Sequence, residues 1–177
     1  QNTVGQLGEA SLVNRLTPVR VPLATPALVI AAGGSTMAAQ LSDLTVAAWG
    51  AGSLGQLGTG GTANRATPAV LGMLSRLRHV AVGREHVMAQ DSRGQVFAWG
   101  SNGTSRLGAG ADALYVTATT PAESRFIAVL GLALGAEHSA AITASGAVMS
   151  AGFGWHGQLG TGAQTNASSP VAAGTLS

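Results

Sequence analysis

The sequence predicts an all-β fold, namely a partial β-propeller with about three and a half four-stranded blades. The first observation behind this prediction is a short glycine loop that recurs along the whole chain. Its last glycine stands at positions 8, 58, 108 and 160, which gives steps of 50, 50 and 52 residues. Steps of this size are typical of solenoids and propellers. The four copies are Val4–Gly8, Leu54–Gly58, Thr104–Gly108 and His156–Gly160.

The second observation is that each repeat contains several strand patterns. Three windows of 21 residues align without gaps and begin at Ile30, Val80 and Leu132. Each window holds short apolar runs separated by turn residues, which favours strands joined by hairpins. A last short strand is expected beyond each glycine loop, around a proline that suits an edge strand because it cannot donate to a ladder. These prolines are Pro18, Pro68, Pro121 and Pro170. Four strands per repeat is the size of a propeller blade.

The repeat divides the chain into a single incomplete propeller domain over residues 1–177. Full repeats are expected at 24–73, 74–125 and 126–177, and residues 1–23 form the tail of an earlier repeat without its leading strands. A closed propeller needs at least about four blades, and exposed sheet edges need cover. We therefore expect a fragment of a longer protein, a pair of half-propellers, or a subunit of a larger assembly.

Three motifs resemble the regulator of chromosome condensation repeat family. They are the Gly-x-x-His elements at 83–86 and 135–138, the stretch Gly94–Asn102 with its Trp-Gly pair, and the Gly-Gln-Leu-Gly loops. The resemblance implies a seven-bladed type of propeller. The kelch repeat, which has a similar period, is the poorer alternative because its Gly-Gly doublet does not recur at one place in these repeats.

Several recurring residues are predicted to be structural. Trp49 and Trp99 occupy the same repeat position and are expected to anchor the core. Gly58 and Gly160 allow the turn of the glycine loop, in which a leucine fills the core and a glutamine can bond the backbone. The resemblance implies that the equivalent His86 and His138 make hydrogen bonds that tie one blade to the next.

Other residues depart from the repeat and are candidates for contact with a partner. Trp155 takes a loop position held by small residues in other copies, and Phe153 and His156 are next to it. An equally weighted alternative is that Trp155 fills the core, because the tryptophan position of its repeat holds Ala151. Two further candidates are Arg106, which replaces the loop glutamine, and Tyr115, which lies in a longer loop.

The amino-acid composition argues against several classes of function. Only 9% of residues are charged, the net charge is +2, and cysteine is absent, which excludes disulfides and thiol chemistry. The four histidines lack the spacing of a metal or catalytic motif, so no cofactor is expected. Nucleic-acid binding is not favoured because the arginines are interspersed with acids. The longest apolar run, 126–134, is too short for membrane insertion.

We therefore expect a non-enzymatic scaffold for protein–protein interaction that acts within a larger assembly. Its partners would be other proteins, and self-association is a further expectation. The alternative follows from the resemblance alone, since the founding member of the family is an exchange factor for a small GTPase. On that alternative the chain would be a guanine nucleotide exchange factor.

Overall fold

The computed structural model describes residues 1–72, 74, 76–110 and 117–174, and this part of the chain is all-β. Its twelve strands form three four-stranded antiparallel sheets, which confirms the predicted fold class. Blade 1 consists of β1 (Ala27–Gly33), β2 (Thr36–Leu41), β3 (Val46–Gly50) and β4 (Arg65–Leu71). Blade 2 consists of β5 (Leu77–Val82), β6 (His86–Asp91), β7 (Val96–Ser101) and β8 (Thr117–Glu123). Blade 3 consists of β9 (Val129–Leu134), β10 (His138–Thr143), β11 (Val148–Gly152) and β12 (Ala167–Ala172).

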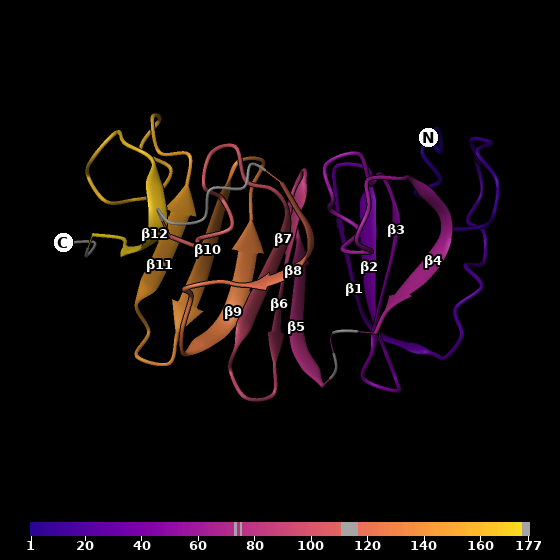
Figure 1. The fold of residues 1–177 in the computed structure, drawn as a ribbon, viewed down its shortest axis with the longest axis horizontal. Coiled ribbons are helices and arrows are strands. Elements are labelled where there is room, and N and C mark those ends of the chain that lie inside the picture. The colour runs from indigo at the N-terminus through magenta and orange to yellow at the C-terminus, as the bar shows by residue number, and fades with distance from the viewer. Residues whose placement is uncertain (73, 75, 111–116, 175–177) are drawn as a thin grey trace.

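The three blades follow one another in chain order. Figure 1 shows blade 1 and the N-terminus at one end of the molecule and blade 3 and the C-terminus at the other. Within each blade the strands are also in chain order, and β5 contacts β1 and β2 just as β9 contacts β5 and β6. The first strand of blade 2 and that of blade 3 therefore each pack against the first two strands of the blade before.

Short turns connect the second and third strands of each blade. In blade 2 the Asp91 carboxylate accepts hydrogen bonds from the backbone N–H groups of Arg93 and Gln95, both at 2.9 Å. Gly94 has a φ of 86°, a left-handed conformation that glycine adopts without steric cost. The local sequence therefore fixes the hairpin between β6 and β7, and with it the register of the two strands.

The hydrophobic core lies between the blades. Side chains alternate along each strand, so one set faces the following blade and the other faces the preceding blade. Val46 and Val96 face forward and are fully buried, while Val87 and Trp99 fill the opposite face of blade 2. Glutamines add a polar tie, since Gln90 Nε2 donates to the carbonyl oxygen of Val129 at 2.9 Å. Gln40 and Leu77 make the same bond between blades 1 and 2.

Tryptophan joins each of the first two glycine loops to the next blade. Trp99 Nε1 donates to the Gln56 carbonyl at 3.0 Å, and Trp49 Nε1 donates to the Gln6 carbonyl at 3.1 Å. The ring lies so close that a Cβ atom at Gly58 would stand 2.8 Å from the indole nitrogen of Trp99. The last glycine of the loop is therefore required both for its φ of 67° and for this contact.

The junction between blades 2 and 3 replaces this indole with two residues. Ala151 stands at the tryptophan position, and a Cβ atom at Gly108 would instead lie 2.7 Å from the ring of Phe126. Phe126 is 2% exposed and so fills the missing volume. Ser139 Oγ supplies the hydrogen bond, donating to the Arg106 carbonyl at 2.6 Å. The alternative that Trp155 fills this volume is wrong, because that side chain is exposed.

Residues 1–23 repeat the loop of a blade but not its strands. The backbone N–H of Asn2 donates to Asn14 Oδ1 at 2.7 Å, as that of Gly52 does to Asn64 Oδ1 at 2.9 Å. The strand expected around Pro18 does not form in the described structure. Its counterpart β4 is held by pairing with β3, and no described strand takes the place of β3 beside residues 15–21.

The indole hydrogen bond gives a first prediction. Trp99→Phe retains an aromatic ring but leaves the buried Gln56 carbonyl without its donor, so it should lower the free energy of unfolding by about 1–3 kcal/mol. Trp155→Phe is the matched control on an exposed side chain and should change it by less than about 0.5 kcal/mol. Urea denaturation measures both values, and equal losses in the two variants would contradict the account.

Candidate interaction surface

One face of the molecule is built from the loops that follow the third strand of each blade. We call it the loop face, and it comprises the described loop residues 51–64, 102–110 and 153–166 together with the tight turns 34–35, 84–85 and 136–137. The backbone at or just before the start of each loop is bonded to the turn of its own blade, for example from the N–H of Ser101, the last residue of β7, to the Glu85 carbonyl at 2.9 Å. The Phe153 N–H makes the equivalent bond to Glu137 at 2.9 Å. The rigid sheets therefore position this face.

Glutamine side chains brace three of the glycine loops. The side-chain oxygen of Gln56 accepts a hydrogen bond from the Leu54 N–H at 2.8 Å, and that of Gln158 accepts one from the His156 N–H at 2.9 Å. Gln6 does the same for Val4 at 3.2 Å. Gly160 has a φ of 69°, close to that of Gly58. The loops thus share one conformation, as the repeated sequence predicts.

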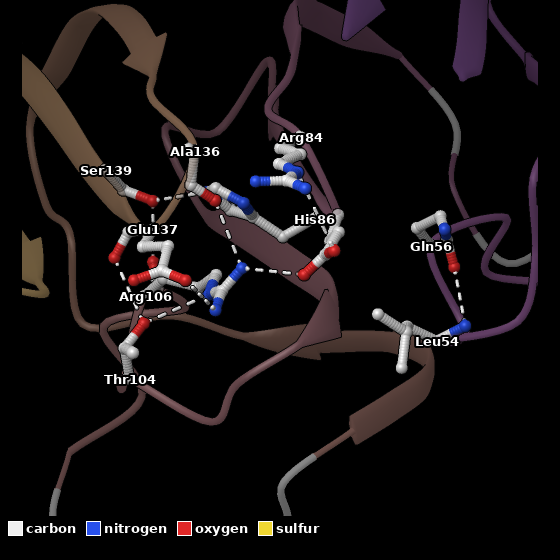
Figure 2. A network of polar contacts seen from close by, with 10 residues as sticks. Leu54, Gln56, Arg84, His86, Thr104, Arg106, Ala136, Glu137 and Ser139 are labelled. Atoms are coloured by element: carbon white, nitrogen blue, oxygen red, sulfur yellow. Dashed lines mark hydrogen bonds and ion pairs between the residues drawn. The ribbon is translucent and has the colours of Figure 1, made fainter. Parts of the chain in front are cut away.

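The Arg106 side chain has no acceptor atom, so it cannot accept the hydrogen bond that glutamine accepts in the other loops. It links blades 2 and 3 instead (Figure 2). Its guanidinium donates to Thr104 Oγ1 at 3.1 Å and to the Ala136 carbonyl at 3.1 Å. It also pairs with Glu85 at 3.3 Å and lies 3.9 Å from a carboxylate oxygen of Glu137. The side chain is only 4% exposed. The prediction that Arg106 contacts a partner is therefore corrected, because this side chain is buried and bonded in the junction between blades 2 and 3.

His86 joins the same network through Ser139. Its Nε2 lies 2.9 Å from Ser139 Oγ, whose single proton is directed to the Arg106 carbonyl. Ser139 must therefore accept at the second contact, so His86 carries its proton on Nε2. Burial, together with the smaller electrostatic effects of Arg106 and His138, lowers the pKa of His86 to about 3. His86 is thus a neutral residue that ties blade 2 to blade 3 at ordinary pH.

The aromatic group of the third loop is the exposed part of the loop face. Trp155 is 61% exposed, and the rings of Phe153 and His156 meet edge to face with their centroids 5.5 Å apart. The backbone beneath them is held by bonds from Gly157 to the Gly154 carbonyl and from Gly154 to Asn166 Oδ1, at 2.9 and 3.0 Å. We call Phe153, Trp155 and His156 the aromatic loop. It presents a large amphipathic side chain on a fixed turn.

The remaining predicted residues lie apart from the aromatic loop. Trp49 and Trp99 are buried in the core, and Gly58 lies beneath Trp99. His138 is half-buried in blade 3, at the position equivalent to His86. Tyr115 lies outside the described residues. Sequence reasoning missed Phe126 and Ser139, although the change from tryptophan to Ala151 signalled that other residues must complete the junction.

The described residues contain no group of three histidine, aspartate or glutamate side chains that could hold a metal ion. Nor do they include a helix with the length and apolar character needed to cross a membrane.

A protein-family model tests the family resemblance that the sequence motifs suggest. The regulator of chromosome condensation (RCC1) repeat matches residues 45–90 and 93–142, which is more than half of the chain. The chain belongs to the RCC1 repeat family. Each RCC1 repeat match begins just before the third strand of one blade and ends in the second strand of the next, so the sequence unit is offset from the blade.

Solved RCC1 propellers share the fold. Human WBSCR16 matches with a TM-score of 0.81 and 21% identity, over 97% of this chain and 45% of that protein. Yeast RCC1 (Prp20), in a structure with Kap60 bound, matches with a TM-score of 0.77 and 21% identity over 85% of this chain and 37% of that one. A second structure of Prp20p from Saccharomyces cerevisiae gives 0.77 and 22%, over 85% and 39%. The chain therefore spans less than half the length of these propellers. No curated protein sequence matches it.

The buried His86 makes the stability of this RCC1 propeller depend on pH. The pKa rises from about 3 in the folded chain to its ordinary value of 6.5 on unfolding, so the unfolded state binds an additional proton below pH 6.5. This group should lower the free energy of unfolding by about 1.4 kcal/mol per pH unit between 6.5 and 3.

The test compares the chain with its His86→Gln variant in urea titrations at pH 7 and pH 5. The loss of stability on acidification should be smaller in the variant by about 2 kcal/mol. Equal losses in both proteins would show that His86 is not held neutral by burial.

Proposed function

We propose that this chain is a non-enzymatic scaffold for protein–protein interaction whose contact site is the aromatic loop. The observation that carries the proposal is Trp155, which is 61% exposed on a loop whose backbone is fixed by hydrogen bonds. Tryptophan is enriched at the energetic centres of protein interfaces. A side chain presented on a fixed turn loses little further conformational freedom on binding.

The equivalent loops of the other blades support the same assignment. They have the same backbone arrangement, but the position of Trp155 holds Ser53 in blade 1 and Gly103 in blade 2. The architecture of the loop does not need an aromatic residue at this position, and the core junction is completed by Phe126. Trp155 is therefore free to serve binding. Phe153 and His156 would border the contact.

The neighbouring structures favour a protein as the partner. Yeast RCC1 (Prp20) was solved with Kap60 bound, and the second Prp20p structure concerns binding to Gsp1p and histones. Their likeness to this chain is one of fold, so the partner is not carried over with it. Exchange activity on a small GTPase is the competing function. It is tested by the release of labelled nucleotide from a panel of purified GTPases, and strong acceleration would overturn the scaffold proposal.

Trp155→Ala should weaken binding without weakening the fold. Proteins retained by the immobilised chain from an extract of its source cells are first identified, and the affinity of each purified partner is then measured by titration. The variant should bind at least about tenfold more weakly, while its free energy of unfolding stays within about 0.5 kcal/mol of the original.

Val70→Ala is the matched control, since Val70 is 51% exposed on the outer strand β4 of another blade. It should leave partner affinity unchanged. An equal loss of affinity in both variants, or undiminished binding by Trp155→Ala, would contradict the assignment of the aromatic loop.

A further inference from the structure

The end of the sheets opposite the loop face carries a groove of about 270 Å³ between blades 2 and 3. We call it the turn groove, because it lies beside the turn that joins β6 to β7 (Figure 1). Its walls come from this turn, from β5 and from β9, and they include Arg78, Ser92, Arg93, Val129 and Leu130. Blade 2 has a neighbouring blade on each side, so the exposure of its two arginines does not depend on where the chain begins or ends.

The two arginines of the turn groove belong to blade 2 and not to the repeat. Arg78 is exposed on β5, and the equivalent position holds leucine in both other blades. Arg93 is exposed in the β6–β7 turn, where blade 1 has an aspartate and blade 3 a serine. The architecture of a blade therefore needs a cation at neither position.

Hydrogen bonds fix the backbone that carries these arginines. The Ser92 N–H donates to the Arg76 carbonyl at 2.8 Å, which holds the turn beside the start of β5. Gln90 also lines the groove, and its Nε2 donates to the Val129 carbonyl at 2.9 Å. This second bond joins the wall from blade 2 to the wall from blade 3. The groove is therefore a built feature of the junction between two blades.

The acids that are close to these arginines in the sequence are engaged elsewhere in the fold. Glu85 lies on the loop face and pairs with Arg106 at 3.3 Å. The Asp91 carboxylate accepts the backbone hydrogen bonds of its own turn. Within the described part of the chain, neither Arg78 nor Arg93 forms an ion pair with an acidic residue. Both guanidinium groups can therefore pair with an anionic partner.

Apolar side chains border the cationic part of the turn groove. Leu130 lines the groove and is 58% exposed. Ile127 is 75% exposed and lies one residue before Ala128, which also lines the groove. A guanidinium pairs well with a carboxylate, to which it can donate two parallel hydrogen bonds, and an exposed leucine gains by contact with another apolar group. The groove thus suits a ligand that is both acidic and apolar.

The size of the groove indicates a protein segment as that ligand. Its volume of about 270 Å³ lies below the roughly 300–1,000 Å³ that is usual for small-molecule sites, so it fits a few side chains better than a metabolite. Nucleic acids bind through several phosphate contacts, and they offer no aliphatic side chain to Leu130. An acidic peptide segment offers both carboxylates and aliphatic groups.

We propose that the turn groove binds an acidic segment of a partner protein. Carboxylates of the segment pair with Arg78 and Arg93, and an apolar side chain next to them packs against Leu130. Complementary charge also speeds the encounter of two proteins. The turn groove and the aromatic loop lie at opposite ends of the sheets, so this inference does not depend on the aromatic loop.

Fluorescence anisotropy with the full chain tests the role of the arginines. The probe is a fluorescein-labelled peptide of Glu-Glu-Leu repeats, which should bind, whereas the same peptide with Gln in place of Glu should not. Arg78→Gln combined with Arg93→Gln should weaken binding at least about tenfold, because both charge-assisted contacts are lost. The matched control combines Arg65→Gln with Arg84→Gln, which removes the same charge from exposed arginines outside the groove. It should weaken binding less than about twofold, because salt screens distant exposed charges.

Several results of this experiment would overturn the proposal. One is that the folded chain does not bind the acidic peptide. Another is an equal loss of affinity in the two double variants, which would show that net charge alone attracts the peptide. A DNA duplex that binds more tightly than the peptide, with the same dependence on Arg78 and Arg93, would assign the groove to nucleic acid instead.

The apolar contact is tested with Leu130→Gln and a second probe in which Ser replaces Leu. The variant should bind the Glu-Glu-Leu peptide at least about threefold more weakly, because an apolar contact is lost, and should bind the Glu-Glu-Ser peptide as the original chain does. Leu28→Gln is the matched control, since Leu28 is the equivalent leucine of blade 1 and is 59% exposed. Unchanged binding of the leucine peptide by Leu130→Gln, or an equal loss with Leu28→Gln, would contradict the inference.

Discussion

The fold depends on how the backbone carbonyl of each glycine loop is satisfied across the gap between blades. The carbonyls of Gln6 and Gln56 accept a hydrogen bond from the indole N–H of the following blade, and that of Arg106 accepts one from Ser139 Oγ. An aromatic ring beside the last glycine of the loop closes each junction. A buried carbonyl without a donor is costly, so these bonds favour one fixed contact between each of these loops and the following blade.

The junction between blades 2 and 3 reaches the same result with different residues, and its polar part is larger. Phe126 supplies the ring and Ser139 the donor, while His86 and Arg106 surround the bond with further contacts. A neutral His86 and a buried Arg106 accompany this substitution. The blade that it supports also carries Trp155. The aromatic loop therefore belongs to the blade that this junction supports, and Figure 2 shows the polar contacts of the junction.

Features that recur in every repeat could be predicted from the sequence, whereas a residue that compensates for a missing repeat residue could not. The repeat determines four strands per blade, the burial of Trp49 and Trp99, and the turn at Gly58, because each of these follows from a local pattern. Replacement of tryptophan by Ala151 was visible, but the residue that fills its space lies 25 positions earlier and belongs to another alignment column. Phe126 stands where the preceding repeat has Leu74. The available signal was therefore that one repeat position gains side-chain volume where another, the tryptophan position, loses it.

Arg106 shows the corresponding limit for the surface. A charged residue at a loop position is expected to be exposed, and only the convergence of two turns from different blades places Glu85 and Ala136 within reach of its guanidinium. The strand around Pro18 fails for a related reason, since an edge strand exists only beside its neighbour. Sequence periodicity identifies the repeat, whereas the residues that pack against a repeat decide which strands and contacts it forms.

The most direct test of the account is a double-mutant cycle on Phe126 and Ala151 by urea denaturation. Phe126→Ala should lower the free energy of unfolding by about 3–5 kcal/mol, and Ala151→Trp alone should lower it by about 1–3 kcal/mol through overpacking. In the double variant the new indole at position 151 occupies the space that Phe126 leaves, so this variant should be more stable than Phe126→Ala. Strictly additive losses would show that Phe126 does not hold the place of the tryptophan, and would contradict the central claim.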